Sequence, residues 1–239
     1  YNKVIVVKYG GNAMINEELK EQVMQDIVLL HLIGVKVVLV HGGGPEISEM
    51  LNKIGKESLW VDGLRVTDKE TAEVVQMVLA GKINKSLVNL LNVRGGNAMG
   101  ISGIDGRLIT AEVKDERLGF VGRITDVNVA PILNLLKHDY IPVVSTVGCD
   151  KNGNVYNINA DTAAAFIAGA LEAECLISMT DIAGLLEDKD NPETLIPKIT
   201  VSEAKKLFET GIISGGMIPK IECCLEAIEK GVKKVFIMD

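Results

Sequence analysis

The chain has 239 residues, a formal net charge of −7 and 47% hydrophobic residues. A chain of this length forms one large domain or two small ones, and this composition excludes a disordered or fibrous protein. The acidic balance argues against a general binder of nucleic acids or anionic membranes, so a few local cations would have to bind any anionic ligand.

The cysteines and histidines carry no signature of a disulfide scaffold or a zinc site. The four cysteines form no C-x-x-C pair and the three histidines are scattered, which predicts reduced thiols in a cytoplasmic protein. The longest apolar run, at 162–171, is about half of the 18 or more residues that a membrane-spanning helix needs, so we expect no membrane span. Strand-like runs lie next to Tyr1 and Asp239, and we therefore expect residues to be missing at both ends.

Strand-like and helical patterns alternate from the start of the chain. Apolar runs rich in valine at 4–7 and 35–40 predict buried strands, and apolar residues recur at helical spacing over 19–30. A second helix is expected after the second strand, with Pro45 in its first turn. This order of elements is typical of an α/β protein with a mainly parallel sheet.

Two short motifs mark the beginnings of later helices. In Thr67-x-x-Glu70 and Thr200-x-x-Glu203, a threonine precedes a glutamate by three residues, which is the spacing of a capping box. In such a box the hydroxyl and the carboxylate each accept a hydrogen bond from a backbone N–H of the first turn. We expect a helix to begin directly after each threonine.

The middle of the chain departs from the regular alternation. Short strands expected at 98–101, 107–113 and 121–126 are separated by glycine turns, which predicts a hairpin excursion that covers a site. The remaining expected elements are helices at 130–137, 160–171, 201–209 and 217–230, and strands at 141–145, 175–179 and 235–238. We place a boundary near residue 173, between an N-terminal lobe of residues 1–173 and a C-terminal lobe of residues 174–239.

Two glycine turns follow the first two predicted strands. Lys8 precedes Gly10 and Gly11, so a cation and free N–H groups would lie at the edge where open α/β sheets bind ligands. His41 precedes three glycines at 42–44, which let the backbone approach a ligand and begin a helix whose N–H groups suit an anion. Taken alone, the lysine is better explained as a solvated residue before a turn. Two such turns at one sheet edge make a binding site as well supported as a flexible turn.

Other polar residues precede or begin predicted helices. Arg65 offers a planar fork for a carboxylate, or else it forms a surface ion pair. Asn157 and Asp161 come just before a helix, where Asp161 either caps the helix or holds a lysine in place. Lys220 lies in a first helical turn, where its charge opposes the helix dipole, and this placement indicates an anion nearby.

Several nucleotide-binding and hydrolase motifs are missing from the sequence. It contains no G-x-x-x-x-G-K-[ST], no G-x-G-x-x-G, no H-R-D loop and no G-x-S-x-G elbow. P-loop ATPases, dinucleotide-dependent dehydrogenases, protein kinases and Ser-His-Asp hydrolases are therefore disfavoured.

The motifs, taken in their order, resemble those of the amino acid kinase family. They are the segments 8–14, 41–45, 63–67, 157–161, 181–186 and 215–220. The resemblance extends over essentially all 239 residues, and the segments 63–67 and 157–161 are similar to the branch that acts on N-acetyl-L-glutamate. It implies a three-layer αβα sandwich with a mainly parallel central sheet, an N-terminal lobe that binds the amino acid and dimerises, and a C-terminal lobe that binds ATP.

The resemblance also implies roles for individual residues. Lys8 and Lys220 would flank the transferring phosphoryl group, with Asp161 orienting both lysines. The implied substrate-binding residues are Gly43, Gly44, Arg65 and Asn157. The implied ATP-binding residues are Gly10, Gly11, Asp181, Gly184, Leu186, Ile213 and Ser214.

The implied reaction moves the γ-phosphoryl group of ATP to the side-chain carboxylate of N-acetyl-L-glutamate, giving N-acetylglutamyl 5-phosphate in arginine biosynthesis. A carboxylate with an ordinary pKa of about 4.3 is ionised at pH 7, so the reaction requires no general base. Two lysines, backbone N–H groups and Mg²⁺ held by the nucleotide phosphates would neutralise the transferring group. We expect no metal site built from protein side chains.

The resemblance implies a homodimer, and a hexamer with arginine as an effector where an N-terminal helix is present. Alternatives are another carboxylate or carbamate kinase of the same family, or a catalytically silent small-molecule sensor. The substrate of a carbamate kinase has no α-carboxylate that Arg65 and Asn157 could bind. A silent sensor has no need to keep Lys8, Asp161 and Lys220.

Overall fold

A six-stranded parallel sheet forms the centre of the molecule. The structure, a computed structural model, describes residues 3–180, 184–188, 191–213 and 217–238. Within these residues the sheet has the order β12-β11-β1-β2-β8-β5, and every neighbouring pair is parallel. Its strands are β1 (Val4–Tyr9), β2 (Lys36–His41), β5 (Ala98–Ser102), β8 (Ile141–Ser145), β11 (Cys175–Met179) and β12 (Val235–Met238).

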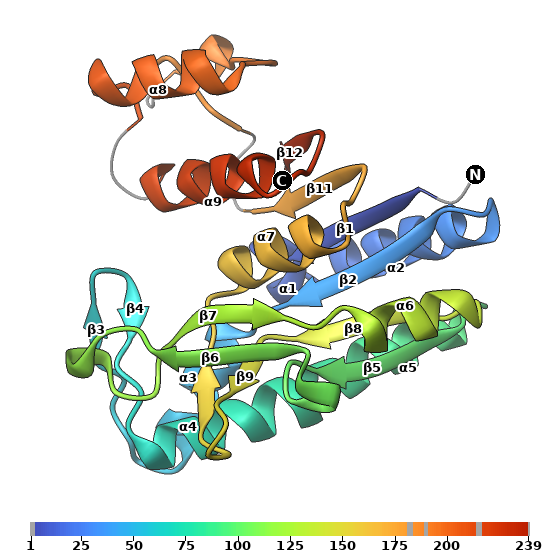
Figure 1. The fold of residues 1–239 in the computed structure, drawn as a ribbon, viewed down its shortest axis with the longest axis vertical. Helices are drawn as coiled ribbons and strands as arrows, with labels where there is room; N and C mark the ends of the chain where they lie inside the picture. Colours follow the sequence, from blue (N-terminus) through green and yellow to red (C-terminus); the bar gives the residue numbers. More distant parts are fainter. Residues whose placement is uncertain (1–2, 181–183, 189–190, 214–216, 239) are drawn as a thin grey trace.

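Helices cover both faces of this sheet, so the predicted three-layer fold is confirmed (Figure 1). The helices packed on one face are α2 (Glu17–Leu32), α3 (Gly44–Lys53), α4 (Lys69–Gln76) and α5 (Asn84–Val93). The helices packed on the other face are α6 (Ala130–Lys137), α7 (Ala160–Ala170) and α9 (Met217–Glu229). Alternate strand residues point to opposite faces, so Val7 joins the first core and Val6 the second.

A second, smaller sheet lies beside the main one. It contains two of the three strands that were predicted to form the hairpin excursion. Its strands, in the order β10-β9-β6-β7, are β6 (Ile109–Val113), β7 (Gly122–Val127), β9 (Val147–Cys149) and β10 (Val155–Asn157). The expected hairpin is confirmed for β6 and β7, which pair antiparallel. The prediction was wrong for residues 98–101, because β5 pairs in parallel with β8 at the edge of the main sheet.

Short elements complete the chain. A two-stranded hairpin consists of β3 (Trp60–Val61) and β4 (Leu64–Arg65). The π-helix η1 (Met77–Ile83), which the sequence analysis did not predict, joins α4 to α5. The other short elements are α1 (Asn12–Ile15), η2 (Asp105–Arg107), η3 (Glu116–Leu118), η4 (Pro192–Thr194) and α8 (Val201–Glu209).

Only one of the two predicted capping boxes forms. Thr200 and Glu203 exchange the expected hydrogen bonds at the start of α8. Thr67 does not cap α4, because it is fully buried and its backbone bonds the chain at Leu118 and Phe120. Asp68 caps this helix instead, accepting a 2.8 Å hydrogen bond from the N–H of Thr71.

The predicted lobe boundary near Ala173 lies between α7 and β11. Both sides of this position contribute to the main sheet, because β11 pairs with β1. A separate apolar cluster contains Leu185, Ala204, Ile213 and Ile221, and it joins α8 to α9. The division into residues 1–173 and 174–239 remains a prediction. Among the described residues, no helix has the length and apolar character needed to cross a membrane.

A buried histidine–asparagine contact ties three strands of the main sheet together. The Nδ1 of His41 lies 2.9 Å from the carbonyl oxygen of Gly42, and its Nε2 lies 3.2 Å from the Nδ2 of Asn84. Asn84 also donates to the carbonyl oxygens of Ile101 and Val143, at 3.2 and 3.0 Å. The Nδ1 of a neutral imidazole donates here and its Nε2 accepts. Burial lowers the pKa of His41 to about 4.

We predict that lowering the pH from about 6.5 to about 4 destabilises this protein more than its His41→Gln variant. The unfolded chain binds a proton at His41 near pH 6.5, whereas the folded chain keeps this group neutral until about pH 4, so stability falls through that window. The difference reaches about 3 kcal/mol at most. Chemical denaturation at several pH values measures it, and an equal pH dependence in both proteins would contradict the prediction. The glutamine oxygen can still accept from Asn84.

Candidate active site

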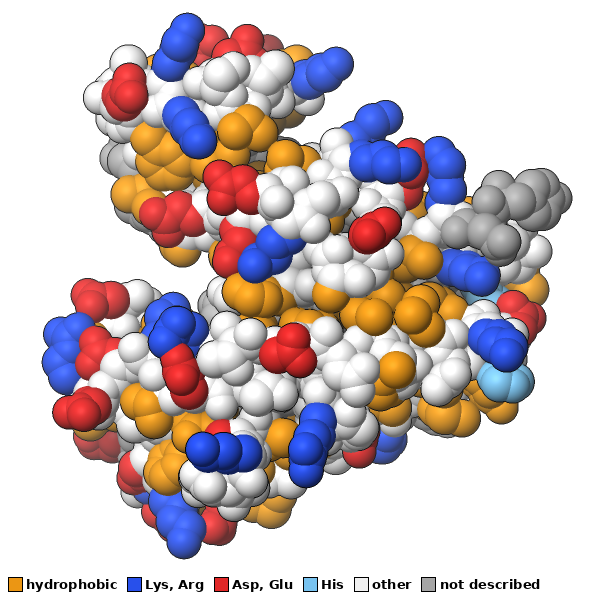
Figure 2. All heavy atoms as spheres, in the orientation of Figure 1, with side chains coloured by type: hydrophobic (Ala, Val, Ile, Leu, Met, Phe, Trp, Pro, Cys, Tyr) orange, Lys and Arg blue, Asp and Glu red, His pale blue; other side chains and the backbone are white. Residues whose placement is uncertain are grey.

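A cavity of about 260 Å³ lies beyond the carboxyl ends of β1 and β2. Its wall includes both predicted glycine turns, the β3–β4 hairpin and the first residues of α7. Figure 2 shows a notch in the outline of the molecule between the region of α9 and that of the β3–β4 hairpin. The cavity thus occupies the edge of the sheet at which ligands bind in open α/β proteins.

Eight of the residues proposed from the sequence line this cavity together. They are Lys8, Gly10, Gly11, Gly43, Gly44, Arg65, Asn157 and Asp161. They come from four separate parts of the chain, 8–11, 43–44, 65 and 157–161, which lie together at one edge of the parallel sheet.

At two positions of the glycine turns, an added side chain would have to displace a neighbouring side chain. A Cβ on Gly43 would lie 2.8 Å from the Cδ2 of Leu79, which belongs to the π-helix η1. A Cβ on Gly10 would lie 2.7 Å from the Nζ of Lys8. Both glycines therefore let the backbone pass close to groups that shape the cavity.

Two helix N-termini face the cavity. Gly43 precedes α3, and Gly44 is its first residue. Asn159 caps α7 by accepting a 3.0 Å hydrogen bond from the N–H of Thr162. Asn159 is therefore the N-cap of this helix. This excludes the interpretation of Asp161 as a helix cap and leaves the one in which it holds a lysine in place. Helix N-termini carry partial positive charge and N–H donors, so both favour an anion in the cavity.

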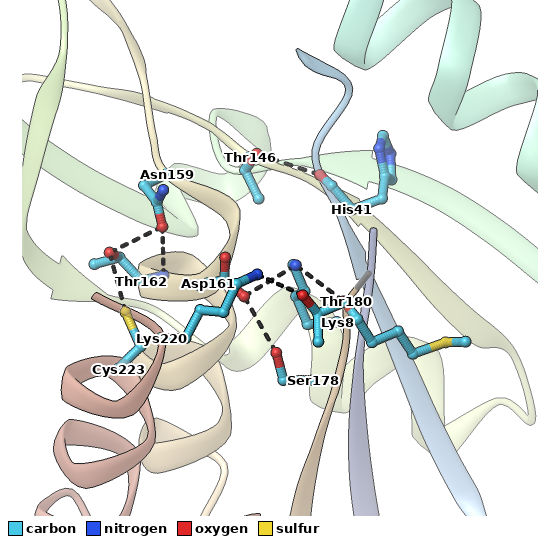
Figure 3. A network of polar contacts seen from close by, with 11 residues as sticks. Lys8, His41, Thr146, Asn159, Asp161, Thr162, Ser178, Thr180, Lys220 and Cys223 are labelled. Carbon is cyan, nitrogen blue, oxygen red and sulfur yellow. Dashed lines mark hydrogen bonds and ion pairs between the residues drawn. The ribbon is translucent and has the colours of Figure 1, made fainter. Parts of the chain in front are cut away.

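Lys8 and Asp161 form a largely buried ion pair at the end of β1 (Figure 3). The Lys8 Nζ lies 3.0 Å from the Asp161 Oδ1, and the lysine side chain is 8% exposed. The same amine donates to the carbonyl oxygen of Met179 at 3.1 Å, and Ser178 donates to the Asp161 Oδ1 at 3.2 Å. The amine is thus held in place, and the carboxylate, with 23% of its side chain exposed, partly offsets its charge.

Lys220 approaches the same group of polar contacts from α9 (Figure 3). Its Nζ donates a hydrogen bond to the hydroxyl of Thr180, the residue directly after β11. The two lysines therefore reach the carboxyl edge of the sheet from opposite ends of the sequence. That Asp161 orients both of them remains a prediction.

Arg65 is buried in the cavity wall, and its hydrogen-bond partners in the described part of the chain are neutral groups. It donates to the hydroxyl of Ser58, to the carbonyl oxygen of Gly44 at 3.0 Å and to the Ser48 hydroxyl at 2.7 Å. Burial lowers the pKa of this guanidinium, which is 4% exposed. Within the described part of the chain it has no ion-pair partner. A buried cation of this kind favours an anion bound in the cavity.

Asn157 lines the cavity together with Arg65 and is linked to it through Thr67. Its Nδ2 donates to the Thr67 hydroxyl at 3.3 Å, and that hydroxyl donates to the carbonyl oxygen of Arg65 at 2.8 Å. This chain of hydrogen bonds links β10 to β4, so it fixes the two residues relative to each other.

Among the residues proposed to bind the nucleoside, the described ones, Gly184, Leu186 and Ile213, do not line this cavity. Ile213 belongs to the apolar cluster of α8 and α9, and Leu186 pairs with Leu195 in an isolated bridge near Gly184. Two further proposed residues, Asp181 and Ser214, lie outside the described residues.

The cysteines nearest to the ion pair are protonated at neutral pH. Burial raises the pKa of Cys223 to about 11 and that of Cys224 to about 12. A thiol nucleophile needs a lowered pKa, so these residues do not supply one.

Metal ligands are sparse in this site. Across the described ranges, no group of three or more His, Cys, Asp and Glu side chains could hold a metal ion. Asp161 is the one carboxylate among the described residues that line the cavity, and it is paired with Lys8. The side chains present therefore fit a metal that arrives with a ligand better than one held by the protein.

The sequence analysis missed several residues that shape the site. Ser178 and Thr180 hold Asp161 and Lys220, and nothing in the sequence marks these hydroxyls. Trp60 lies over the guanidinium of Arg65, 4.4 Å from its central carbon to the ring centre. The Asp-Gly turn between them is a hairpin signal that would have placed the two residues opposite each other.

Comparisons with known proteins agree with this fold and identify the family. The model of the amino acid kinase family matches residues 3–239. The acetylglutamate kinase of Brachyspira hyodysenteriae is 55% identical over 239 residues, covering 99% of this chain and 83% of that protein. The crystal structure of smu.665 from Streptococcus mutans has a TM-score of 0.88 and 32% identity, covering 99% of this chain and 94% of that one.

A more distant likeness concerns the fold alone. Carbamate kinase from Giardia lamblia bound to AMP-PNP has a TM-score of 0.76 at 18% identity, with coverage of 99% of this chain and 92% of that one. The family model matches residues 3–239, and a relative with 55% identity covers 99% of the chain. On this evidence, the chain belongs to the amino acid kinase family.

Proposed function

We propose that this chain is an ATP-dependent kinase that transfers the γ-phosphoryl group to the side-chain carboxylate of N-acetyl-L-glutamate, in arginine biosynthesis. The observation that carries this assignment is Arg65, a buried cation in the cavity wall whose hydrogen-bond partners among the described residues are all neutral. A buried cation of this kind favours an acceptor that brings its own carboxylate. The relationship to acetylglutamate kinases over 99% of the chain names that acceptor.

In this proposal Arg65 and Asn157 bind the α-carboxylate of the acceptor. A guanidinium presents its N–H donors in a plane that matches a carboxylate, and Asn157 lines the same cavity. Fixing this end of the acceptor aligns the other carboxylate with the phosphoryl group. Because the reactants are already oriented when transfer begins, less entropy is lost in reaching the transition state.

Lys8, Lys220 and the N–H groups of Gly43 and Gly44 act on the transferring phosphoryl group. The acceptor carboxylate is already ionised at pH 7, since its ordinary pKa is about 4.3. The barrier therefore comes from bringing two anions together and from the charge spread over the phosphoryl oxygens. The ion pair with Asp161 keeps the Lys8 amine at a fixed position, so little reorganisation is needed during transfer.

The nucleotide phosphates lie along Gly10 and Gly11 in this proposal. The proposed nucleoside-binding residues are Asp181, Gly184, Leu186, Ile213 and Ser214. Mg²⁺ arrives with the nucleotide and supplies further neutralisation of the phosphates, because the described side chains offer it no cluster of ligands. The N-terminal lobe then binds the acceptor, and the C-terminal lobe binds ATP.

Assembly and regulation are further parts of the proposal. A homodimer through the N-terminal lobe, a hexamer where an N-terminal helix is present, and arginine as an effector follow from the family resemblance. A cytoplasmic location follows from the same resemblance and from the reduced cysteines.

The first test is formation of an acyl phosphate, trapped with hydroxylamine. We expect a hydroxamate with ATP and N-acetyl-L-glutamate, and none with L-glutamate, L-aspartate or carbamate. A hydroxamate with a different acid would support the proposed reaction type but identify a different acceptor. A folded protein that binds ATP and gives no product with any acid would support the sensor alternative.

Replacing Lys8 should affect turnover more than binding. We predict that Lys8→Met lowers kcat about 100-fold or more and changes either KM by less than about threefold, because the amine acts on charge that develops during transfer. Steady-state kinetics with both substrates measure this. The matched control is Lys3→Met, which removes an exposed lysine at the other end of β1 that pairs with Glu174. An unchanged kcat in Lys8→Met would contradict the role of Lys8 in stabilising the transferring phosphoryl group.

Replacing Arg65 should affect one substrate only. We predict that Arg65→Lys raises the KM for N-acetyl-L-glutamate about 10- to 100-fold, because hydrogen bonds between charged groups are lost, and leaves the KM for ATP near that of the wild type. Arg123→Lys is the control, since Arg123 forms an exposed ion pair with Glu112 away from the cavity. A parallel rise in both KM values would contradict a specific role in acceptor binding.

A further inference from the structure

The β3–β4 hairpin places Trp60 directly over Arg65. The strands pair antiparallel with Trp60 opposite Arg65. The two residues that join them, Asp62 and Gly63, both have positive φ angles, of 50° and 76°. Positive φ at both positions is the mark of a type I′ turn, which fixes the register of a two-residue hairpin. The local sequence therefore determines that these side chains form a cross-strand pair.

The ring covers one face of the guanidinium. The central carbon of Arg65 lies 4.4 Å from the ring centre of Trp60, within the range of a cation–π interaction. Arg65 is 4% exposed, whereas Trp60 is 54% exposed and lines the cavity. The ring thus covers one face of the guanidinium without taking any of its N–H donors.

The remaining contacts of Arg65 lie around its edge. Three hydrogen bonds, to Ser58, Gly44 and Ser48, use the two terminal nitrogens. A guanidinium has five N–H donors, so these bonds leave donors for a ligand in the same plane. Stacking on one face and hydrogen bonds at the edge together fix the orientation of that plane.

We propose that Trp60 is a positioning residue for the acceptor: its ring fixes the plane of the Arg65 fork against the α-carboxylate of N-acetyl-L-glutamate and so sets selectivity for acids that carry this group. This inference rests on the proposed function. The ring also offsets part of the cost of burying an arginine without an acidic partner, because its negative face interacts with the cation. Trp60 itself touches no transferring atom.

The test compares Trp60→Leu, Trp60→Phe and the wild type with two ligands. One ligand is N-acetyl-L-glutamate, and the other is 4-acetamidobutanoate, which has the acetyl group and the terminal carboxylate but lacks the α-carboxylate. We expect Trp60→Leu to raise the KM for N-acetyl-L-glutamate about tenfold, from the loss of a desolvated cation–π contact. The inhibition constant of 4-acetamidobutanoate, the KM for ATP and kcat should each change by less than about twofold. Trp60→Phe keeps an aromatic face and should recover most of the affinity.

The outcomes separate this inference from simpler explanations. An unchanged KM for N-acetyl-L-glutamate in Trp60→Leu overturns it. Equal weakening of both ligands also overturns it, because a ring that merely shapes the cavity would affect both. Phe236→Leu, which removes an exposed aromatic residue on the edge strand β12, is the matched control.

A failure of the proposed function gives a different pattern. In that case the wild type forms no acyl phosphate with N-acetyl-L-glutamate, or Arg65→Lys binds it as well as the wild type does. If Trp60→Leu does not fold, Trp60→Phe and Trp60→His replace it. Selectivity for the α-carboxylate that falls from wild type through Phe to His with unchanged kcat supports the inference, and unchanged selectivity overturns it.

Discussion

The pairing of β1 with two parallel neighbours is the constraint on which the site depends. β1 hydrogen-bonds with β2 and β11, so Lys8 is level with Val40 on one side and Ser178 on the other. Lys8 points to the same face as Val6, which packs against α7, the helix that carries Asp161. A shift of one residue would exchange Val6 and Val7 between the two cores. Apolar packing therefore directs the lysine toward its carboxylate.

Local charge in the cavity is opposite in sign to that of the whole chain. The chain carries a formal net charge of −7, yet the described cavity wall contains Lys8, Arg65 and a single carboxylate, Asp161. The N-termini of α3 and α7 add two further positive ends. Exposed surface charges farther away than about 10 Å are largely screened at moderate salt, so these near groups dominate at the site. An acidic protein can thus bind anionic substrates.

Periodicity and turn chemistry made the framework predictable from sequence. The buried strands and most helices follow from apolar patterns, and the glycines after Lys8 and His41 marked the functional edge of the sheet. Tertiary pairing overrode local signals elsewhere. Thr67 has the sequence of a cap, but its backbone bonds a distant segment. Residues 98–101 look like part of a hairpin, but the main sheet offers them a parallel partner. The hydroxyl partners of the site could not be predicted, because Ser178 is far in sequence from the lysine it lies beside.

The position of Trp60 gives the molecule an internal optical reporter. The chain contains one tryptophan, and it lies in the wall of the cavity on a short hairpin. Its fluorescence therefore originates from this region alone, whereas circular dichroism at the amide bands averages over every helix and strand. The apolar cluster joining α8 to α9 holds no tryptophan among its described residues, so loosening that far end would change ellipticity and leave the emission unaltered. Recording fluorescence and circular dichroism during denaturation would show which of these two regions unfolds first.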